Sequence, residues 1–245
     1  IRDQPRSRGL GDVYKRQQSY DRIEVIVVDN YSVDGTREIA NMLGARVYLK
    51  GGERSAQVNF GVEVATGEYV MRVDSDMVAD PHVVEACVNR ALAKGLDAIV
   101  VPVMPHPSQL RCFWARCRLL EKKLLIGDWV NVSPRFVKRE AFLSIGGYDV
   151  RLIAWEDYDF YNRLISGGFR VGHIAKPFLW HLGEPKSLRD VVIRMYRYGR
   201  TGSLGTFVSR NRLRGVRQLN PIKPSMVRNI RRLAGDPVHS AGLVF

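Results

Sequence analysis

The order of apolar and polar positions along the chain predicts an α/β fold. A β-branched run at residues 23–28 is typical of a buried parallel strand, and shorter apolar runs at 46–49, 69–73 and 98–103 indicate further strands. Segments with helical spacing separate these strands, at residues 37–43, 53–65 and 81–93. The alternation predicts a mixed, mostly parallel, Rossmann-like sheet flanked by helices, with right-handed β–α–β crossovers.

The second half of the chain continues in the same manner, with more helix than strand. The predicted elements are helices at 109–125, 136–145 and 155–164, short strands near Val171 and at 178–180, and an amphipathic basic helix at 191–198. No internal repeat is present, so these elements extend one α/β unit.

Composition places the chain among ordinary globular proteins. Its 245 residues can bury the core of one large or two small domains, and 45% hydrophobic and 26% charged residues are usual values. No apolar stretch reaches the ~20 residues of a membrane-spanning helix. Cys87, Cys112 and Cys117 are odd in number and lack the spacing of a zinc knuckle, which indicates reduced thiols in a cytoplasmic protein.

The net charge of +13 is concentrated toward the C-terminal end. From Lys186 onward, thirteen Lys and Arg residues stand against two aspartates, so this segment carries +11. We therefore divide the chain into a leader at 1–17 without apolar period, a main domain at 18–185 and a basic, mainly helical extension at 186–245. The extension favours an anionic partner: a membrane surface, a phosphorylated substrate or nucleic acid.

Two carboxylates stand where the strand predicted at 69–73 ends. Asp74 and Asp76 flank Ser75, and ligands of open α/β sheets bind beyond the carboxyl ends of the strands. A divalent metal that carries a phosphate would suit them, because hard cations prefer carboxylate oxygen. Surface turns also use Asp and Ser for local hydrogen bonds, so a simple turn is the alternative.

A second acidic cluster, Glu156, Asp157 and Asp159, stands at the start of the helix predicted at 155–164. The helix dipole and the free N–H groups favour acids there, so capping is the interpretation that the residues alone give. His181 follows a short strand, where an ordinary, partly buried histidine is the structural interpretation.

Several motifs stand in a fixed order along the chain. They are Val27-Val28-Asp29-Asn30 with Ser32 and Asp34-Gly35-Thr36, Ala56-Gln57-Val58-Asn59-x-Gly61, Gly67-Glu68-Tyr69 before Asp74-Ser75-Asp76, Gly146-Gly147-Tyr148-Asp149, Glu156-Asp157-x-Asp159, and His181. The ordered set, over about residues 19–200, resembles the family 2 glycosyltransferases. These are inverting enzymes of the GT-A fold that use nucleotide-sugar donors.

The resemblance implies metal-dependent sugar transfer. Asp76 is similar to the family's metal-binding acid, Asp74 to the acid near the ribose and the metal, and His181 to the histidine that completes the site, with Mn²⁺ or Mg²⁺ as cofactor. A cation that bridges the diphosphate stabilises the leaving group. Asp157 resembles the base that takes the acceptor proton, with Glu156 orienting the site or the acceptor.

The resemblance also implies a pocket for the nucleotide sugar. Its predicted residues are Asp29 at the nucleotide base, Asn30 and Ser32 beside it, and Arg54, Asn59, Asp74 and Ser75. Val58 stands where many relatives carry Arg, and Arg54 would supply that charge to the diphosphate; a solvated helix face is the alternative for Arg54.

The family normally has one more strand upstream of the strand that ends at Asp29. The leader occupies its place, so we expect N-terminal truncation and a donor pocket that lacks some contacts. The expected donor is UDP- or GDP-linked, the acceptor is a glycan or a lipid-linked acceptor, and the location is the cytoplasm, at the inner face of the membrane.

Three other interpretations stay open. One is a nucleic-acid-binding module that uses the arginine-rich end with its interleaved Tyr196, Tyr198 and Phe207, although no helix-turn-helix, zinc or RNA-binding signature accompanies it. The second is a nucleotidyltransferase of related fold, against which the helix with Glu156 and Asp157 argues. The third is an inactive member of the family.

Overall fold

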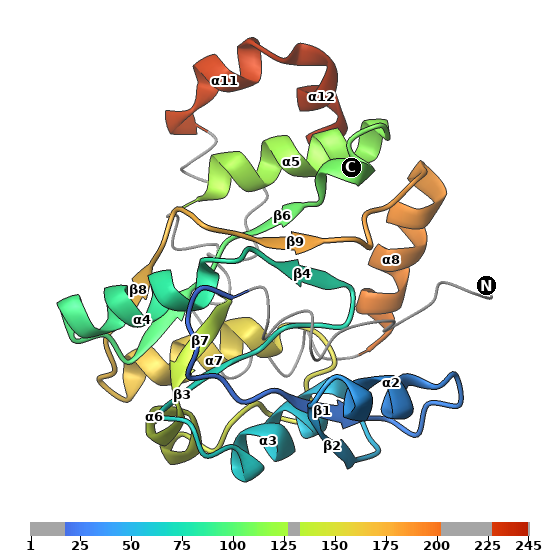
Figure 1. Ribbon diagram of the computed structural model, residues 1–245. Coiled ribbons are helices and arrows are strands. Elements are labelled where there is room, and N and C mark those ends of the chain that lie inside the picture. The colour runs from blue at the N-terminus through green and yellow to red at the C-terminus, as the bar shows by residue number, and fades with distance from the viewer. Residues whose placement is uncertain (1–17, 127–132, 202–226, 245) are drawn as a thin grey trace.

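The computed structural model describes residues 18–126, 133–201 and 227–244 (Figure 1). The predicted leader at 1–17 and the part of the basic extension at 202–226 lie outside the described residues. Across the described ranges, no helix combines the length and the apolar content that crossing a bilayer requires.

The first β–α–β unit forms as predicted. β1 (Ile26–Asp29) and β2 (Arg46–Leu49) pair in parallel, and helix α2 (Thr36–Met42) connects them. Gly44 follows α2 with a φ of 79°, the left-handed conformation that commonly ends a helix. The unit places Asp29 at the carboxyl end of β1.

The second sheet has the order β3-β7-β5-β8. Its strands are β3 (Tyr69–Met71), β7 (Pro134–Lys138), β5 (Ala98–Val100) and β8 (Val171–His173). Strand β7 runs antiparallel to both of its neighbours, whereas β5 and β8 are parallel.

The third sheet has the order β4-β9-β6, from β4 (Met77–Ala79), β9 (Leu179–His181) and β6 (Val103–Pro105). β9 is antiparallel to β4 and parallel to β6. The predicted mixed α/β fold is thus confirmed, with parallel and antiparallel pairings equally frequent among the described strands.

Several predicted elements differ from the structure in their bounds, and two differ in kind or in continuity. The helix predicted at 136–145 begins only at Arg139, as α6 (Arg139–Ser144), because Phe136 and Val137 are buried in β7 between β3 and β5. The strand predicted at 98–103 is interrupted at Pro102, which has no N–H for a ladder, and the chain passes there from β5 to β6.

Helices cover the sheets (Figure 1). The remaining ones are α3 (Arg54–Val64), α4 (Val83–Lys94), η1 (Pro107–Gln109), α5 (Phe113–Leu125), α7 (Glu156–Ser166), α8 (Leu188–Arg200), α11 (Ile230–Ala234), α12 (Pro237–Ala241) and η2 (Gly242–Val244). α12 packs against α5, so the end of the chain contacts the main domain.

Buried apolar side chains form two core clusters. One joins α4 to the sheets through Val83, Ile99 and Phe136, and the other joins α7 to them through Phe160 and Leu164. Phe160 and Leu164 are fully buried, and each burial contributes about 1.5–3 kcal/mol. Because the first turn of α7 carries Glu156 and Asp157, this packing fixes where the two acids lie.

Candidate active site

The loop between β3 and β4 carries Asp74, Ser75 and Asp76. It is a turn, in which the N–H of Met77 donates to the carbonyl of Asp74 over 3.0 Å. The Asp74 side chain is 17% exposed, whereas that of Asp76 is 50% exposed. The turn therefore holds one carboxylate inside the protein and presents the other to solvent.

Asp76 is the first member of a chain of three polar side chains. The antiparallel pairing of β4 with β9 sets Met77 opposite His181, so Oδ2 of Asp76 lies 3.2 Å from Nε2 of His181. On the other side of the ring, Nδ1 lies 2.8 Å from Oε1 of the buried Glu184. Sequence reasoning missed Glu184, although an acid three residues after a predicted metal-binding histidine was a signal.

The charges of this chain shift its pKa values. Burial lowers the pKa of His181, but its bonds to Asp76 and Glu184 outweigh burial and raise the pKa to about 9. The bond to His181 lowers the pKa of Asp76. Glu184 fixes the ring orientation and directs Nε2 toward Asp76, which is the role of carboxylates behind metal-binding histidines.

Asp74 lies between two buried guanidinium groups that the sequence analysis did not identify. Oδ2 of Asp74 is 2.9 Å from Nη2 of Arg135, and Oδ1 is 3.4 Å from Nε of Arg72. Burial would raise the pKa of Asp74, but Arg135 and Arg72 hold it well below its usual range. Both arginines interrupt apolar strand segments, and that interruption was the available signal.

Arg72 also binds the acids of α7. Its Nη1 and Nη2 donate to the two oxygens of Asp157 over 2.9 and 3.3 Å, in a bidentate pair. The guanidinium carbon lies 5.2 Å from the centre of the Tyr148 ring. One buried cation thus connects Asp74, in the turn between β3 and β4, with Asp157 at the start of α7.

Glu156 and Asp157 are neighbours with opposite pKa shifts. Burial and the charge of Asp157 raise the pKa of Glu156, although Arg54 forms an ion pair with it. Burial would also raise the pKa of Asp157, but Arg72 lowers it. Two carboxylates whose environments separate their pKa values are a common arrangement for divided catalytic roles.

The three acids lie in the first turn of α7, where the helix dipole favours them, and each also has a cationic partner. α7 begins after Trp155, whose φ of 69° is unusual for a residue other than glycine and whose side chain makes no capping hydrogen bond. Asp159, the other acid weighed as a cap, is paired with Arg163 one turn later, at 2.7 Å.

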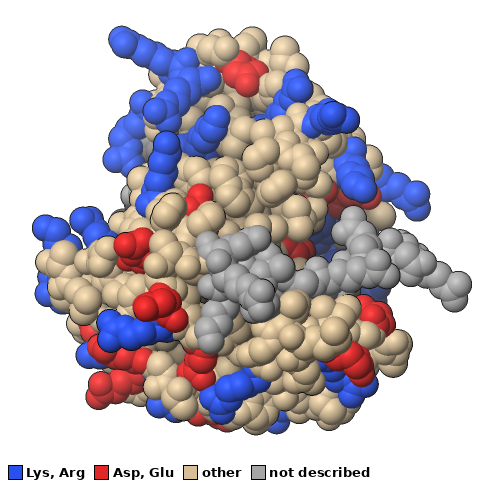
Figure 2. Space-filling view, viewed as in Figure 1, with Lys and Arg blue, Asp and Glu red and all other residues tan. Residues whose placement is uncertain are grey.

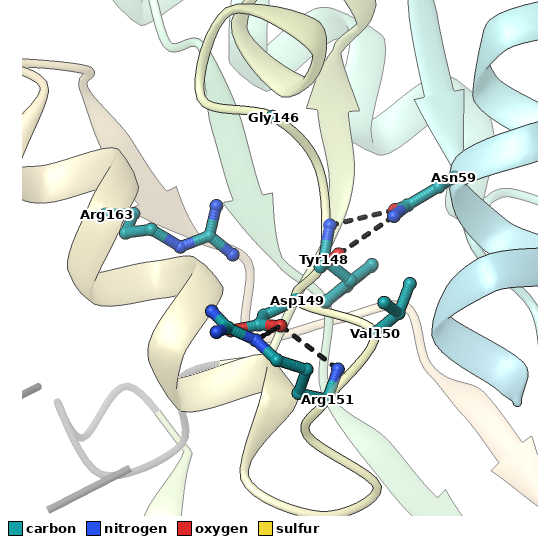
Figure 3. A pocket seen from close by; sticks show the side chains of 7 residues that line it. All are labelled: Asn59, Gly146, Tyr148, Asp149, Val150, Arg151 and Arg163. Atoms are coloured by element: carbon teal, nitrogen blue, oxygen red, sulfur yellow. Dashed lines mark hydrogen bonds and ion pairs between the residues drawn. The ribbon is translucent and has the colours of Figure 1, made fainter. Parts of the chain in front are cut away.

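Asn59 holds the loop before α7. Its Nδ2 donates to the carbonyl of Tyr148, and its Oδ1 accepts from the N–H of Tyr148, both over 2.8 Å (Figure 3). Gly147 has a φ of 65°, and a Cβ there would lie 2.6 Å from Oδ1 of Asn59. Nδ2 and Oδ1 of Asn59, which was predicted to contact the nucleotide, are thus both bonded to the backbone of Tyr148. Asn59 and Tyr148 line an open pocket of about 410 Å³.

The predicted base-binding residues lie in a separate turn after β1. Asp29 is buried, and its Oδ2 accepts from the N–H of Ser32 over 2.8 Å. Asn30 is exposed, and Tyr31 next to it has a φ of 57°. The ion pairs thus form three neighbouring groups: Arg54 with Glu156, Arg72 with Asp74 and Asp157, and Asp76 with His181. Their charges act on one another's pKa values. Asp29 and Ser32 are bonded to each other in the separate turn after β1.

The donor set at Asp76 fits a divalent cation that shares its coordination with a substrate. Among the described residues, no three His, Cys, Asp or Glu side chains form a complete metal cage. Asp76 and His181 offer one carboxylate oxygen and one imidazole nitrogen at a partly exposed place. Cations that serve phosphate substrates often take few protein ligands and complete their shell with phosphate oxygens and water.

Solved structures support the fold. The mannosyltransferase PcManGT from Pyrobaculum calidifontis, in complex with GDP-Man and Mn²⁺, has a TM-score of 0.60 at 17% identity and covers 95% of this chain and 72% of its own. Glucosyl-3-phosphoglycerate synthase from Mycobacterium tuberculosis, with Mn²⁺, UDP and phosphoglyceric acid, has a TM-score of 0.54 at 18% identity, over 81% and 73%. Both likenesses show the GT-A fold.

Sequence relatives agree with this fold. Succinoglycan biosynthesis protein ExoA of Rhizobium meliloti is 29% identical over 216 residues, covering 81% of this chain and 65% of that protein. Glycosyltransferase GlyG of Streptococcus pneumoniae is 35% identical over 92 residues, covering 34% and 30%. The chain thus spans less than two thirds of each relative.

A family profile described as "Glycosyl transferase family 2" matches residues 12–133, about half of the chain. The matched segment contains Asp29, Asn59 and the Asp74–Asp76 turn, and the ExoA alignment extends the likeness over most of the remainder. The fold, the ordered motifs and these matches together show that the chain belongs to glycosyl transferase family 2.

Proposed function

We propose that the chain is a metal-dependent inverting glycosyltransferase, which moves a sugar from a nucleoside diphosphate sugar to an acceptor hydroxyl. One observation carries the proposal: Arg72 pairs with Asp74 in the Asp74–Asp76 turn and with Asp157 next to Glu156. The turn that would bind the metal and the two candidate base residues therefore belong to one site. The complexes of similar structures with UDP, GDP-Man and Mn²⁺ support the classes of donor and cofactor.

On the donor side, Asp76 and His181 would hold Mn²⁺ or Mg²⁺. The bound cation would neutralise charge that develops on the leaving diphosphate. Glu184 keeps the Nε2 of His181 directed at that place, and Arg135 keeps Asp74 ionised beside it. Asp29, Asn30, Ser32 and Ser75 remain the proposed contacts to the nucleoside.

On the acceptor side, we assign the base to Asp157. A base must be ionised before it accepts a proton, and Arg72 ensures this by lowering the pKa of Asp157. The bidentate bond also fixes the direction of its oxygens. Glu156, held by Arg54, would orient the site or the acceptor, while the half-exposed side chain of Arg54 remains available to a diphosphate.

Asn59 has a positioning role in this proposal. Its two hydrogen bonds to Tyr148 shape the loop that leads into α7, in place of the direct nucleotide contact expected from its motif. The residue acts on the site through the loop that it holds.

Donor binding gives the direct test. We expect UDP or GDP to raise the melting temperature of the chain when Mn²⁺ is present, because a ligand at a hundred times its Kd stabilises a protein by about 2.7 kcal/mol. Asp76→Ala should remove the Mn²⁺ dependence of this shift. Thermal-shift titrations with each nucleotide, with and without Mn²⁺, check it; an absence of stabilisation in every condition would contradict the proposal and favour an inactive family member.

A membrane surface is the partner that we propose for α8. Leu188, Val192, Met195 and Tyr196 lie on one face of this helix and are 43%, 57%, 57% and 63% exposed. Arg189 and Arg200 are exposed along the same helix. An apolar helix face bordered by arginines suits the surface of an anionic bilayer, where a lipid-linked acceptor would be located.

We expect the double substitution Val192→Glu and Met195→Glu to weaken binding to vesicles that contain phosphatidylglycerol by about tenfold or more, since it removes two apolar contacts and adds negative charge. Vesicle co-sedimentation measures this. Val33→Glu with Met42→Glu, at positions that are 98% and 85% exposed elsewhere, is the matched control. Equal binding of both double variants would contradict the assignment, and salt-sensitive binding to nucleic acid alone would favour the nucleic-acid-binding alternative.

A further inference from the structure

Two cations lie next to the chain of Asp76, His181 and Glu184, and the proposed reaction gives them no role. α5 carries Arg118 and Lys122 one helical turn apart, so both side chains project from the same face. Nε of Arg118 lies 3.7 Å from Oε2 of Glu184, the residue that holds His181. This face of α5 therefore borders the Asp76–His181–Glu184 chain.

Lys122 forms no ion pair with a described residue. Its side chain is partly buried, yet within the described part of the chain it makes no hydrogen bond or ion pair. Burial and the Arg118 guanidinium lower the pKa of Lys122 to about 8, against the weaker attraction of Glu121 and Glu184. The ammonium group is thus mostly charged at neutral pH, in a place where an arriving anion would stabilise it.

The neighbours of Lys122 also have free hydrogen-bonding capacity. Among the described residues, Nε of Arg118 and Oε2 of Glu184 are buried and make no hydrogen bond, although Arg118 pairs through Nη1 with Glu121. These two atoms face each other in an ion pair of 3.7 Å, which is longer than a hydrogen bond, and the Arg118 charge acts on Lys122. A phosphate group would accept from both cations more favourably than this distant carboxylate does.

The surroundings favour an anion as well. On the face shown in Figure 2, Lys and Arg side chains gather over the upper part, where Figure 1 places α5 and α11, with few acids among them. Arg135, which binds Asp74, is a further charged neighbour of Lys122. The positive potential of this region would attract a substrate phosphate toward the site.

We propose that Arg118 and Lys122 form a phosphate-binding subsite beside the metal site. It takes a phosphate group from one of two sources: the diphosphate of the donor or the phosphate of a phosphorylated acceptor. The identity of these substrates rests on the proposed function, whereas the anion site rests on the side chains of α5.

Isothermal titration calorimetry on the whole chain tests this subsite. The probes are UDP and GDP with Mn²⁺, and geranyl phosphate as a phosphorylated acceptor; the variants are Lys122→Met and Lys122→Gln, with the exposed neighbour Lys123→Met as matched control. We expect the Lys122 variants to weaken the probe that occupies the subsite about tenfold or more, because a charge-assisted bond is lost, and Lys123→Met to stay near the wild type.

The outcomes separate the sources and the two proposals. Loss of nucleotide affinity alone assigns the donor phosphate, and loss of geranyl phosphate affinity alone assigns the acceptor phosphate. Equal affinities of the wild type and both Lys122 variants for every probe would overturn the subsite. If the wild type binds geranyl phosphate through Lys122 but no nucleotide, the subsite stands and the proposed transferase function fails; a wild type that binds none of the probes overturns both.

Discussion

Replacing Asp157 by Asn is expected to lower the rate of sugar transfer by about 10²–10⁴-fold and to leave the binding of the nucleoside diphosphate intact. The amide has nearly the same shape as the carboxylate and can still accept a hydrogen bond from Arg72, but it cannot take the proton of the acceptor hydroxyl. Initial rates with the donor and acceptor that the wild type uses, together with the nucleotide affinity from titration calorimetry, measure both parts of the prediction.

Glu156→Gln is the comparison that separates the base from its neighbour. Glutamine retains an acceptor for Arg54, so we expect a smaller loss of transfer than for Asp157→Asn. Transfer by Asp157→Asn at the wild-type rate would show that the base lies elsewhere. A larger loss for Glu156→Gln than for Asp157→Asn would move the assignment to Glu156, whose raised pKa would then be that of the working base.

Replacing Arg72 by Met is expected to lower the free energy of unfolding by about 3–5 kcal/mol. The Arg72 side chain is only 8% exposed and serves both Asp157 and Asp74, so its removal leaves buried carboxylates short of a counter-ion. Urea unfolding monitored by circular dichroism gives the difference. Adding Asp157→Asn to Arg72→Met should recover part of the loss, because the double variant no longer buries that charge.

Arg46→Met is the matched control for Arg72→Met. Arg46 forms an ion pair with Glu24 at the surface, where the side chains are 45% and 26% exposed, and such pairs contribute about 0–1 kcal/mol. A loss for Arg72→Met no larger than for Arg46→Met would contradict the view of Arg72 as the buried cation on which the site depends.

The sequence predicted those elements in which one periodicity dominates. The helix of Phe160 and Leu164 formed where expected, because its apolar positions match a helix period. The β-branched run before Asp29 also formed a strand, which begins only at Ile26. The segment around Phe136 misled the prediction, since its apolar residues suit either period. Pairing with β3 and β5, which are distant in sequence, made it a strand.

For the site, the ordered motifs located the carboxylates and the histidine but not the groups that hold them. Arg72 and Arg135 were identified only once the chain was folded, because Asp157 and Asp74 lie 85 and 61 residues away from them. Glu184 stands only three residues after His181, and the sequence analysis overlooked it. Arginines are common in this basic chain, so only their position within apolar segments distinguishes the two buried ones from those at the surface.

The contact between Asn59 and Gly147 limits which substitutions the chain can accept. Any residue larger than glycine at position 147 would place its Cβ against the Asn59 amide and would also be strained by the positive φ. A smaller residue at position 59 would make room but would free the loop of Tyr148. The two positions therefore constrain each other, and sequence variation at one should be tolerated only together with compensating variation at the other.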